Sequence, residues 1–120
     1  MANPTADSYL PLQPASFHIL VSLADTDRHG YAIIQDIAER TSGSVRLGAG
    51  TLYRTIQRLL EDGLIVETAE KDRPGPEEDD ERRRYYRITP LGRSVARAEA
   101  DRLAELVRLA RASGLAPKRT

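Results

Sequence analysis

The spacing of hydrophobic residues along the chain predicts a small, mainly helical protein with one β-hairpin. Several stretches carry apolar residues at intervals of three and four, and shorter stretches are alternating or β-branched. The predicted helices span 14–24, 31–41, 48–62 and 90–113, and the predicted strands span 45–47, 64–68 and 83–88. The first helix is apolar on most sides, so we expect it to be buried.

The helix predicted over 48–62 has two distinct faces. One face is apolar and should pack in the core, and it consists of Leu52, Ile56, Leu59 and Leu60. The opposite face repeats at the same helical spacing but is polar, and it consists of Thr51, Arg54, Arg58 and Glu61. This helix should therefore lie on the surface of the domain with a basic face exposed.

The remaining segments predict the organisation of the chain. Residues 1–13 indicate a mobile or loosely docked tail, and residues 14–89 indicate one domain. The segment between strands 64–68 and 83–88 has the composition of a loop, with Pro74-Gly75-Pro76 followed by five acidic residues at 77–81. Thr89 and Pro90 form a favourable helix start, so 90–113 is predicted as one terminal helix and 114–120 as a tail.

The order of these elements is that of a winged helix-turn-helix followed by one extra helix. The fold class is therefore α+β, mainly α. In this architecture the second and third helices dock on DNA, with the third in the major groove.

The charge distribution refines this prediction. The 18 basic and 18 acidic residues give a net charge of zero, which by itself argues against nucleic acid. The charges are unevenly placed, however: residues 40–60 hold four Arg and no acid, and residues 82–98 hold six Arg and no acid. We therefore expect weak nonspecific DNA affinity and binding that depends on a few placed arginines.

Other classes of function find little support in the sequence. There is no cysteine, and His18 and His29 are better explained by core packing and by a local turn than by metal binding. No arrangement of nucleophile, base and acid indicates an enzyme, and no cofactor motif is present. No stretch is long enough to span a bilayer, and the N-terminal residues do not resemble a secretory signal, so the expected location is the cytoplasm.

Four groups of residues together resemble the PadR-like transcriptional regulators over residues 15–112. They are His29-Gly30-Tyr31, Gly50-Thr51-Leu52-Tyr53, Leu59 with Gly63-Leu64-Ile65, and the segment from Arg83 to Thr89 with Gly92. The resemblance implies a homodimeric DNA-binding repressor whose terminal helix supplies much of the dimer contact, as in the subgroup with one short terminal helix. Two departures are the weaker helix cap Gly48-Ala49, where many relatives have Ser-Pro, and a longer, more acidic wing tip, which we expect either to point away from DNA or to stay disordered.

The candidate DNA contacts lie on the third helix, just before it, and on the wing. Arg54 and Arg58 suit either guanine readout or a phosphate contact, unless they pair with acids on the helix surface. Tyr53 either packs in the core or brings its hydroxyl to a phosphate. Arg83 and Arg84 either reach the DNA or neutralise nearby acids. The full predicted set is Arg46, Thr51, Tyr53, Arg54, Arg58, Arg83 and Arg84.

The terminal helix carries an apolar stripe that one small domain cannot cover, which predicts a second copy as its partner. The predicted dimer contacts are Leu91, Val95, Leu103, Leu106, Val107 and Ala110. A repressor needs a release signal, so we expect a small hydrophobic or aromatic effector to enter between the subunits. The alternative function is a winged-helix protein-interaction module that does not read DNA.

Overall fold

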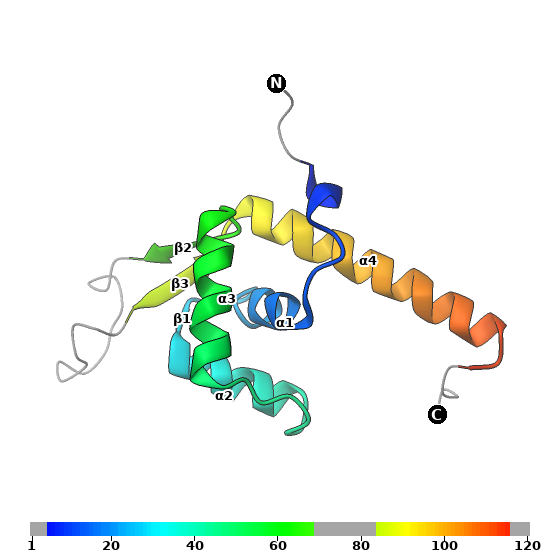
Figure 1. Cartoon of the computed structure of the whole chain (residues 1–120), viewed down its shortest axis with the longest axis horizontal. Helices are drawn as coiled ribbons and strands as arrows, with labels where there is room; N and C mark the ends of the chain where they lie inside the picture. The colour runs from blue at the N-terminus through cyan, green and yellow to red at the C-terminus, as the bar shows by residue number, and fades with distance from the viewer. Residues whose placement is uncertain (1–4, 69–83, 116–120) are drawn as a thin grey trace.

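The computed structural model describes residues 5–68 and 84–115, and its elements follow the predicted order closely (Figure 1). The helices and strands are η1 (Ala6–Tyr9), α1 (Pro14–Ser22), β1 (Arg28–His29), α2 (Gly30–Arg40), α3 (Ala49–Glu61), β2 (Ile65–Thr68), β3 (Tyr85–Ile88) and α4 (Pro90–Ala112). The predicted mainly helical winged helix-turn-helix is confirmed. Arg83 and the acidic run 77–81 lie outside the described residues.

The sheet differs from the prediction in the identity of its third strand. Its order is β1-β3-β2, with both pairs antiparallel, and β1 places Arg28 opposite Tyr86. The strand predicted over 45–47 is absent from the described structure. Val45 and Leu47 instead pack, partly buried, against the core, because this segment joins α2 to α3 and has no strand beside it.

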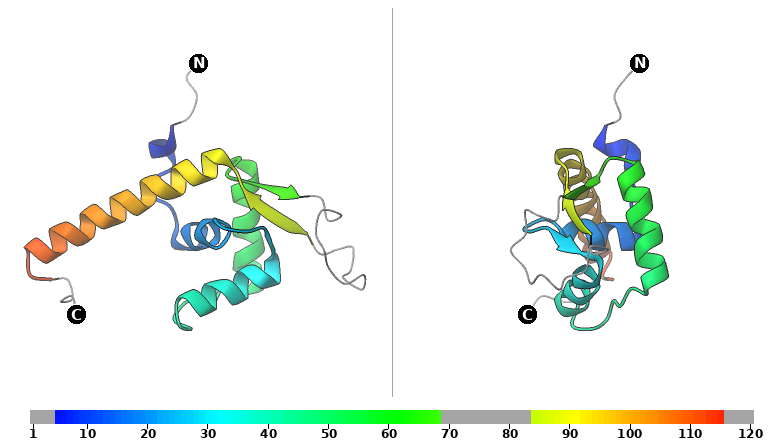
Figure 2. Two further views of the ribbon diagram at one scale, coloured as in Figure 1. Left: turned by 180° about the vertical axis from the view of Figure 1, so that it is seen from behind. Right: turned by 90° about the vertical axis from the view of Figure 1, so that its left-hand side faces the viewer.

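The core lies where α1, α2 and α3 meet the sheet (Figure 2). As predicted, α3 buries Leu52, Ile56 and Leu59, while Leu60 is partly buried. Side chains from α1 and α2, including Ile19 and Ile33, complete this core. Burial of such side chains is the main favourable contribution to folding, at about 1.5–3 kcal/mol for each large residue.

The start of α4 is fixed to the domain by a tight backbone contact. The Thr89 hydroxyl accepts a hydrogen bond from the Gly92 amide (2.9 Å) and donates one to the Gly63 carbonyl (2.7 Å), which confirms the predicted helix cap. Gly92 packs directly against the backbone of Leu64, leaving no room for a Cβ atom. The helix therefore leaves the domain in a defined direction.

Residues 6–12, in the segment expected to be a mobile or loosely docked tail, dock on α4. The 3-10 helix η1 packs along α4, and the amide of Leu12 donates a hydrogen bond to Glu99 Oε1 (3.4 Å). Glu99 is 3 % exposed and receives two further hydrogen bonds from Arg102, both of 2.8 Å. These bonds from Arg102 hold the pKa of the Glu99 carboxyl below its usual range, although burial opposes the shift.

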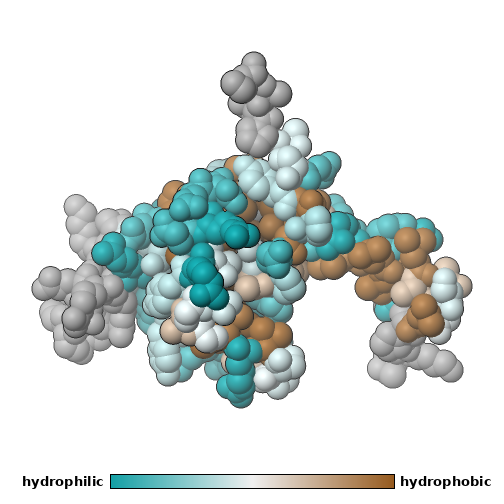
Figure 3. Space-filling view, in the orientation of Figure 1, coloured by the Kyte–Doolittle hydropathy of each residue, from teal (hydrophilic) through white to brown (hydrophobic). Residues whose placement is uncertain are grey.

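The two halves of α4 have different environments. Val95 is completely buried in the core of its own chain, and Leu91 packs partly buried against that core, so Val95 is unavailable for the predicted dimer contact. The distal half projects beyond the domain and leaves three large apolar residues exposed: Leu106, Val107 and Leu109 (Figure 3). Among the described helices, none is long and apolar enough to cross a membrane.

Candidate nucleic-acid interface

The polar face of α3 is exposed as predicted and carries two unpaired guanidinium groups. Arg54 and Arg58, one turn apart, make no ion pair or hydrogen bond with any residue that the structure describes. Glu61, the acid that would neutralise Arg58 on the helix surface, instead accepts a hydrogen bond from Gln57 Nε2 (3.3 Å). The cationic groups of α3 are therefore available to an external anion.

Several other arginines are engaged with carboxylates of the same chain. Arg40 Nε donates to Asp36 Oδ2 (2.6 Å), and Arg28 Nη2 lies 3.3 Å from Asp36 Oδ1. Burial raises the pKa of Asp36, but the hydrogen bond from Arg40 and the charges of both arginines outweigh it, so this pKa lies below its ordinary value. Their charges are partly neutralised within the chain, which distinguishes them from Arg54 and Arg58.

Of the two wing arginines predicted to contact DNA, only Arg84 lies among the described residues, and it is also paired. Arg84 Nη1 donates to Glu67 Oε2 (2.7 Å) across the β2–β3 hairpin, and this bond raises the pKa of Arg84 above its usual value. Of the two roles weighed for Arg84, neutralisation of an acid is the one visible in the fold, although the acid is Glu67 of the neighbouring strand. A DNA contact from Arg84 stays a prediction.

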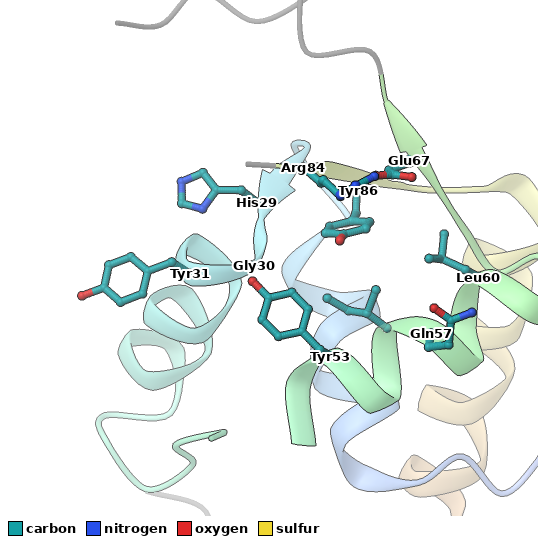
Figure 4. A pocket seen from close by; sticks show the side chains of 10 residues that line it. His29, Gly30, Tyr31, Tyr53, Gln57, Leu60, Glu67, Arg84 and Tyr86 are labelled. Carbon is teal, nitrogen blue, oxygen red and sulfur yellow. The ribbon is translucent and has the colours of Figure 1, made fainter. Parts of the chain in front are cut away.

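Tyr53 neither packs in the core nor stands free in solvent. It is 51 % exposed, and its hydroxyl end rests against Gly30 at the start of α2. It lies at an open pocket of about 550 Å³ between α2, α3 and the hairpin, which Tyr31 and Tyr86 also line (Figure 4). The Tyr53 hydroxyl is thus held at the surface beside the exposed face of α3.

The residues at the two ends of α2 have local structural roles. His29 Nδ1 accepts a hydrogen bond from the Ala32 amide (3.2 Å) and caps α2, in agreement with the predicted turn role. Arg46 is exposed in the α2–α3 connection, and its guanidinium lies close to Gly43.

Among residues 5–68 and 84–115, no three His, Cys, Asp or Glu side chains converge as metal ligands would.

One part of this surface was not predicted from the sequence. Thr51, Arg54 and Arg58 line an open notch together with residues 13–16 at the start of α1. Nothing in the local sequence indicates this neighbour, because it depends on how α1 packs against α3. Ser16, in the first turn of α1, gives no sequence signal of its own.

Comparison with known proteins identifies the family. The model of the transcriptional regulator PadR-like family matches residues 19–98. The chain belongs to this family. This PadR-like chain is 36 % identical over 91 residues to the transcriptional regulator Rv3488 of Mycobacterium tuberculosis, a match covering 76 % of this chain and 77 % of that protein. The resemblance inferred from the sequence motifs is thereby confirmed.

Other comparisons show further similarity in sequence or in fold. An uncharacterised protein X of Lysinibacillus sphaericus is 40 % identical over 76 residues, which cover 63 % of this chain and 65 % of that protein, just under two thirds of its length. A transcriptional regulator from Clostridium thermocellum has the same fold, with a TM-score of 0.67, 27 % identity and coverage of 86 % and 87 %. Bacillus subtilis PadR in complex with operator DNA shares the fold at 19 % identity (TM-score 0.58; coverage 78 % and 48 %).

Proposed function

We propose that this PadR-like protein is a cytoplasmic, sequence-specific DNA-binding regulator that acts as a homodimeric repressor. The observation that carries the proposal is the pair of unpaired guanidinium groups, Arg54 and Arg58, on the exposed face of α3 in a winged helix. An arginine in the major groove binds guanine with two hydrogen bonds or holds a phosphate, and α3 is the element that enters the groove in this architecture. Arg46, Thr51, Tyr53, Arg83 and Arg84 are proposed as accompanying contacts.

The direct test is an electrophoretic shift with DNA from upstream of the protein's own gene. Each good bidentate base contact contributes about 1–3 kcal/mol of discrimination, so the double variant Arg54→Ala/Arg58→Ala should bind at least about tenfold more weakly. Arg97→Ala is the matched control, because Arg97 is exposed on α4 and unpaired among the described residues. Unchanged affinity in the double variant would contradict the role of α3.

We also propose that the projecting half of α4 forms the dimer contact. Leu106, Val107 and Leu109 are between 42 % and 48 % exposed there, and Leu103 and Ala110 are partly exposed. A second copy covers such a stripe most simply through a twofold axis. The two α3 helices would then enter successive major grooves about 34 Å apart on a near-palindromic site.

Repression requires release, for which we propose a small hydrophobic or aromatic effector bound between the subunits near α1 and α4. Phe17 and Val21 of α1 are only partly buried within one chain, which supports an apolar site there. A thermal-shift screen of aromatic compounds tests the idea, and a supporting compound must both raise the melting temperature and weaken DNA binding. Absence of any such compound removes this part of the proposal.

The second candidate is a protein-interaction module, favoured by the net charge of zero and by the Arg84–Glu67 pair on the wing. Salt dependence separates the candidates. A protein that neutralises DNA phosphates releases counterions, so its affinity for DNA falls steeply as the salt concentration rises. No DNA affinity at low salt, together with recovery of a defined protein partner, supports the module. Steep salt dependence supports the DNA-binding regulator.

A further inference from the structure

The start of α1 and the flank of α3 enclose a notch that is rich in hydrogen-bond donors. It measures about 410 Å³ and is lined by residues 13–16 together with Thr51, Arg54, Thr55 and Arg58. No carboxylate is among these lining residues. The chemistry of the lining therefore suits an anion.

The backbone of α1 contributes two donors that have no acceptor in the described structure. Pro14 has no N–H group, and the amide of Phe17 bonds to the Gln13 carbonyl (3.1 Å). Between them, the amides of Ala15 and Ser16 make no hydrogen bond, and the Gln13 side chain does not cap the helix. Free amides at a helix N-terminus point at the site an anion occupies, where the helix dipole also favours negative charge.

Ser16 supplies an independent indication of a ligand. The residue is only 4 % exposed, it lines the notch, and its hydroxyl makes no hydrogen bond with any residue that the structure describes. Among the described residues, the fully buried side-chain oxygens without a partner are Ser22 Oγ and Thr68 Oγ1, so Ser16 Oγ is not sealed in the core but opens onto the notch. A bound anion in the notch would accept the hydrogen bond that Ser16 does not make within the chain.

The two arginines of the notch occupy different places. Arg54 Nη1 lies 3.9 Å from the position that a Cβ atom on Gly50 would take, so its guanidinium sits at the start of α3. Arg58 lies one turn further on and, with Gln13 and Ser16, also lines a smaller adjoining pocket under the N-terminal segment, where Asp62 makes no ion pair with it. Both arginines line the notch with Ser16, but Arg58 also shares the adjoining pocket with Ser16, which Arg54 does not line.

We propose that this notch binds one phosphate of the DNA backbone, held by the Arg58 guanidinium, the Ser16 hydroxyl and the amides of Ala15 and Ser16. The proposal rests on the proposed DNA-binding function and assigns different roles to the two arginines of α3. Phosphates line both walls of the major groove, so a helix inserted there brings its flanks close to them. Arg58 then sets the position of α3, which leaves Arg54, at the start of the helix, to face the base edges.

The test uses the whole protein, a mixed-sequence 30-base-pair duplex and fluorescence anisotropy at several salt concentrations. Arg58→Gln should weaken binding about tenfold and reduce the slope of log affinity against log salt by about one, because one phosphate contact is lost. Ser16→Ala should weaken binding about threefold with an unchanged slope, since the hydroxyl is neutral. Its melting temperature should not fall, because the hydroxyl has no partner within the described chain to lose. Arg97→Gln is the matched control and should behave like the wild type.

The outcomes separate this proposal from the general one. If the wild type fails to bind the duplex even at low salt, the proposed DNA-binding function itself fails. If the wild type binds with a steep salt slope while Arg58→Gln and Ser16→Ala bind like Arg97→Gln, the phosphate site in the notch is refuted but the DNA-binding function is supported. If inorganic phosphate at constant ionic strength raises the melting temperature of the wild type but not of Ser16→Ala, with duplex affinity equal in both, the notch holds free phosphate and the DNA assignment is overturned.

Discussion

The hydroxyl of Tyr53 rests against Gly30, in space that a Cβ atom at position 30 would have to fill. This contact ties the exposed face of α3 to the first residue of α2, and only glycine permits it. The side chain of Leu52 also borders this space, at 3.1 Å from that Cβ position. The placement of Tyr53 and the absence of a side chain at residue 30 are therefore one structural feature.

The first prediction is that Gly30→Ala destabilises the protein through Tyr53. An added methyl group in filled space costs about 1–3 kcal/mol, and here the cost should lie at the lower end because the Tyr53 ring is 51 % exposed and can turn aside. Most of this cost should disappear in a Tyr53→Ala background, because the blocking ring is gone. Urea unfolding of the wild type, the two single variants and the double variant measures the coupling free energy between the two positions. An equal loss of stability from Gly30→Ala in both backgrounds would refute the prediction.

The second prediction concerns Gly92, where the added atom would meet the Leu64 backbone rather than a movable ring. Gly92→Ala should lower the free energy of unfolding by about 2 kcal/mol or more, because the backbone at Leu64 and the first turn of α4 would have to move apart. Gly50→Ala is the matched control, since nothing but Arg54 Nη1, at 3.9 Å, lies near its added atom. That control should gain up to about 1 kcal/mol from better helix propensity. Similar values for both variants would contradict the close approach at Gly92.

The third prediction uses pH to test the buried carboxylate of Glu99. Its pKa is lowered in the folded state, so the folded protein binds its proton less readily than the unfolded chain does. The resulting stability is complete above the ordinary carboxyl pKa of about 4.3 and is lost as pH falls through the lower folded value. Glu99→Gln should cost about 1–3 kcal/mol at pH 7, because it removes charged hydrogen bonds to Arg102 and Leu12.

The difference between Glu99→Gln and the wild type should shrink between pH 5 and pH 3, as judged by urea unfolding at each pH. Glu105→Gln is the control, because Glu105 forms the same type of pair with Arg108 on the exposed part of α4. Exposed pairs of this kind contribute little, so this variant should match the wild type at every pH. A pH-independent cost of Glu99→Gln would show that the carboxylate charge is unimportant.

The fourth prediction addresses the proposed dimer. Leu106→Glu places a charge in the exposed apolar stripe of α4 and should raise the dimer dissociation constant about tenfold or more. Leu115→Glu is the matched control, because Leu115 lies beyond the end of α4 and is already 80 % exposed. Light scattering across a dilution series measures both. Equal dimer dissociation constants for the two variants would show that the projecting half of α4 is not part of the interface.

Much of this fold was predictable because helical periodicity is a local signal. The faces of α3 and the cap at Thr89 follow from residue types at fixed spacing, and the structure confirms both. The two-residue strand β1 was not predictable in the same way, since Arg28 and His29 have no strand-like pattern. They form a strand only because β3 lies beside them.

The terminal helix shows the same limit on a larger scale. Val95 and Leu106 belong to one apolar stripe in the sequence, yet the former is fully buried and the latter 48 % exposed. Periodicity identifies which face of a helix is apolar but not what covers it. The notch beside Ser16 is a still clearer case, because it arises where two helices distant in sequence come together.

The rigid attachment of α4 has a mechanical consequence. Its 23 residues form one uninterrupted helix about 34 Å long, with its first turns locked at Gly92 and Val95 and its last turns outside the domain. Such a helix acts as a lever arm whose fulcrum lies in the core. In the proposed dimer, a change of only about 10° in the angle between the α4 helices of two subunits would move a point 30 Å away by about 5 Å, comparable to the 5.4 Å pitch of a helix. Small adjustments at the proposed dimer contact would thus produce large changes in the separation of the two α3 helices.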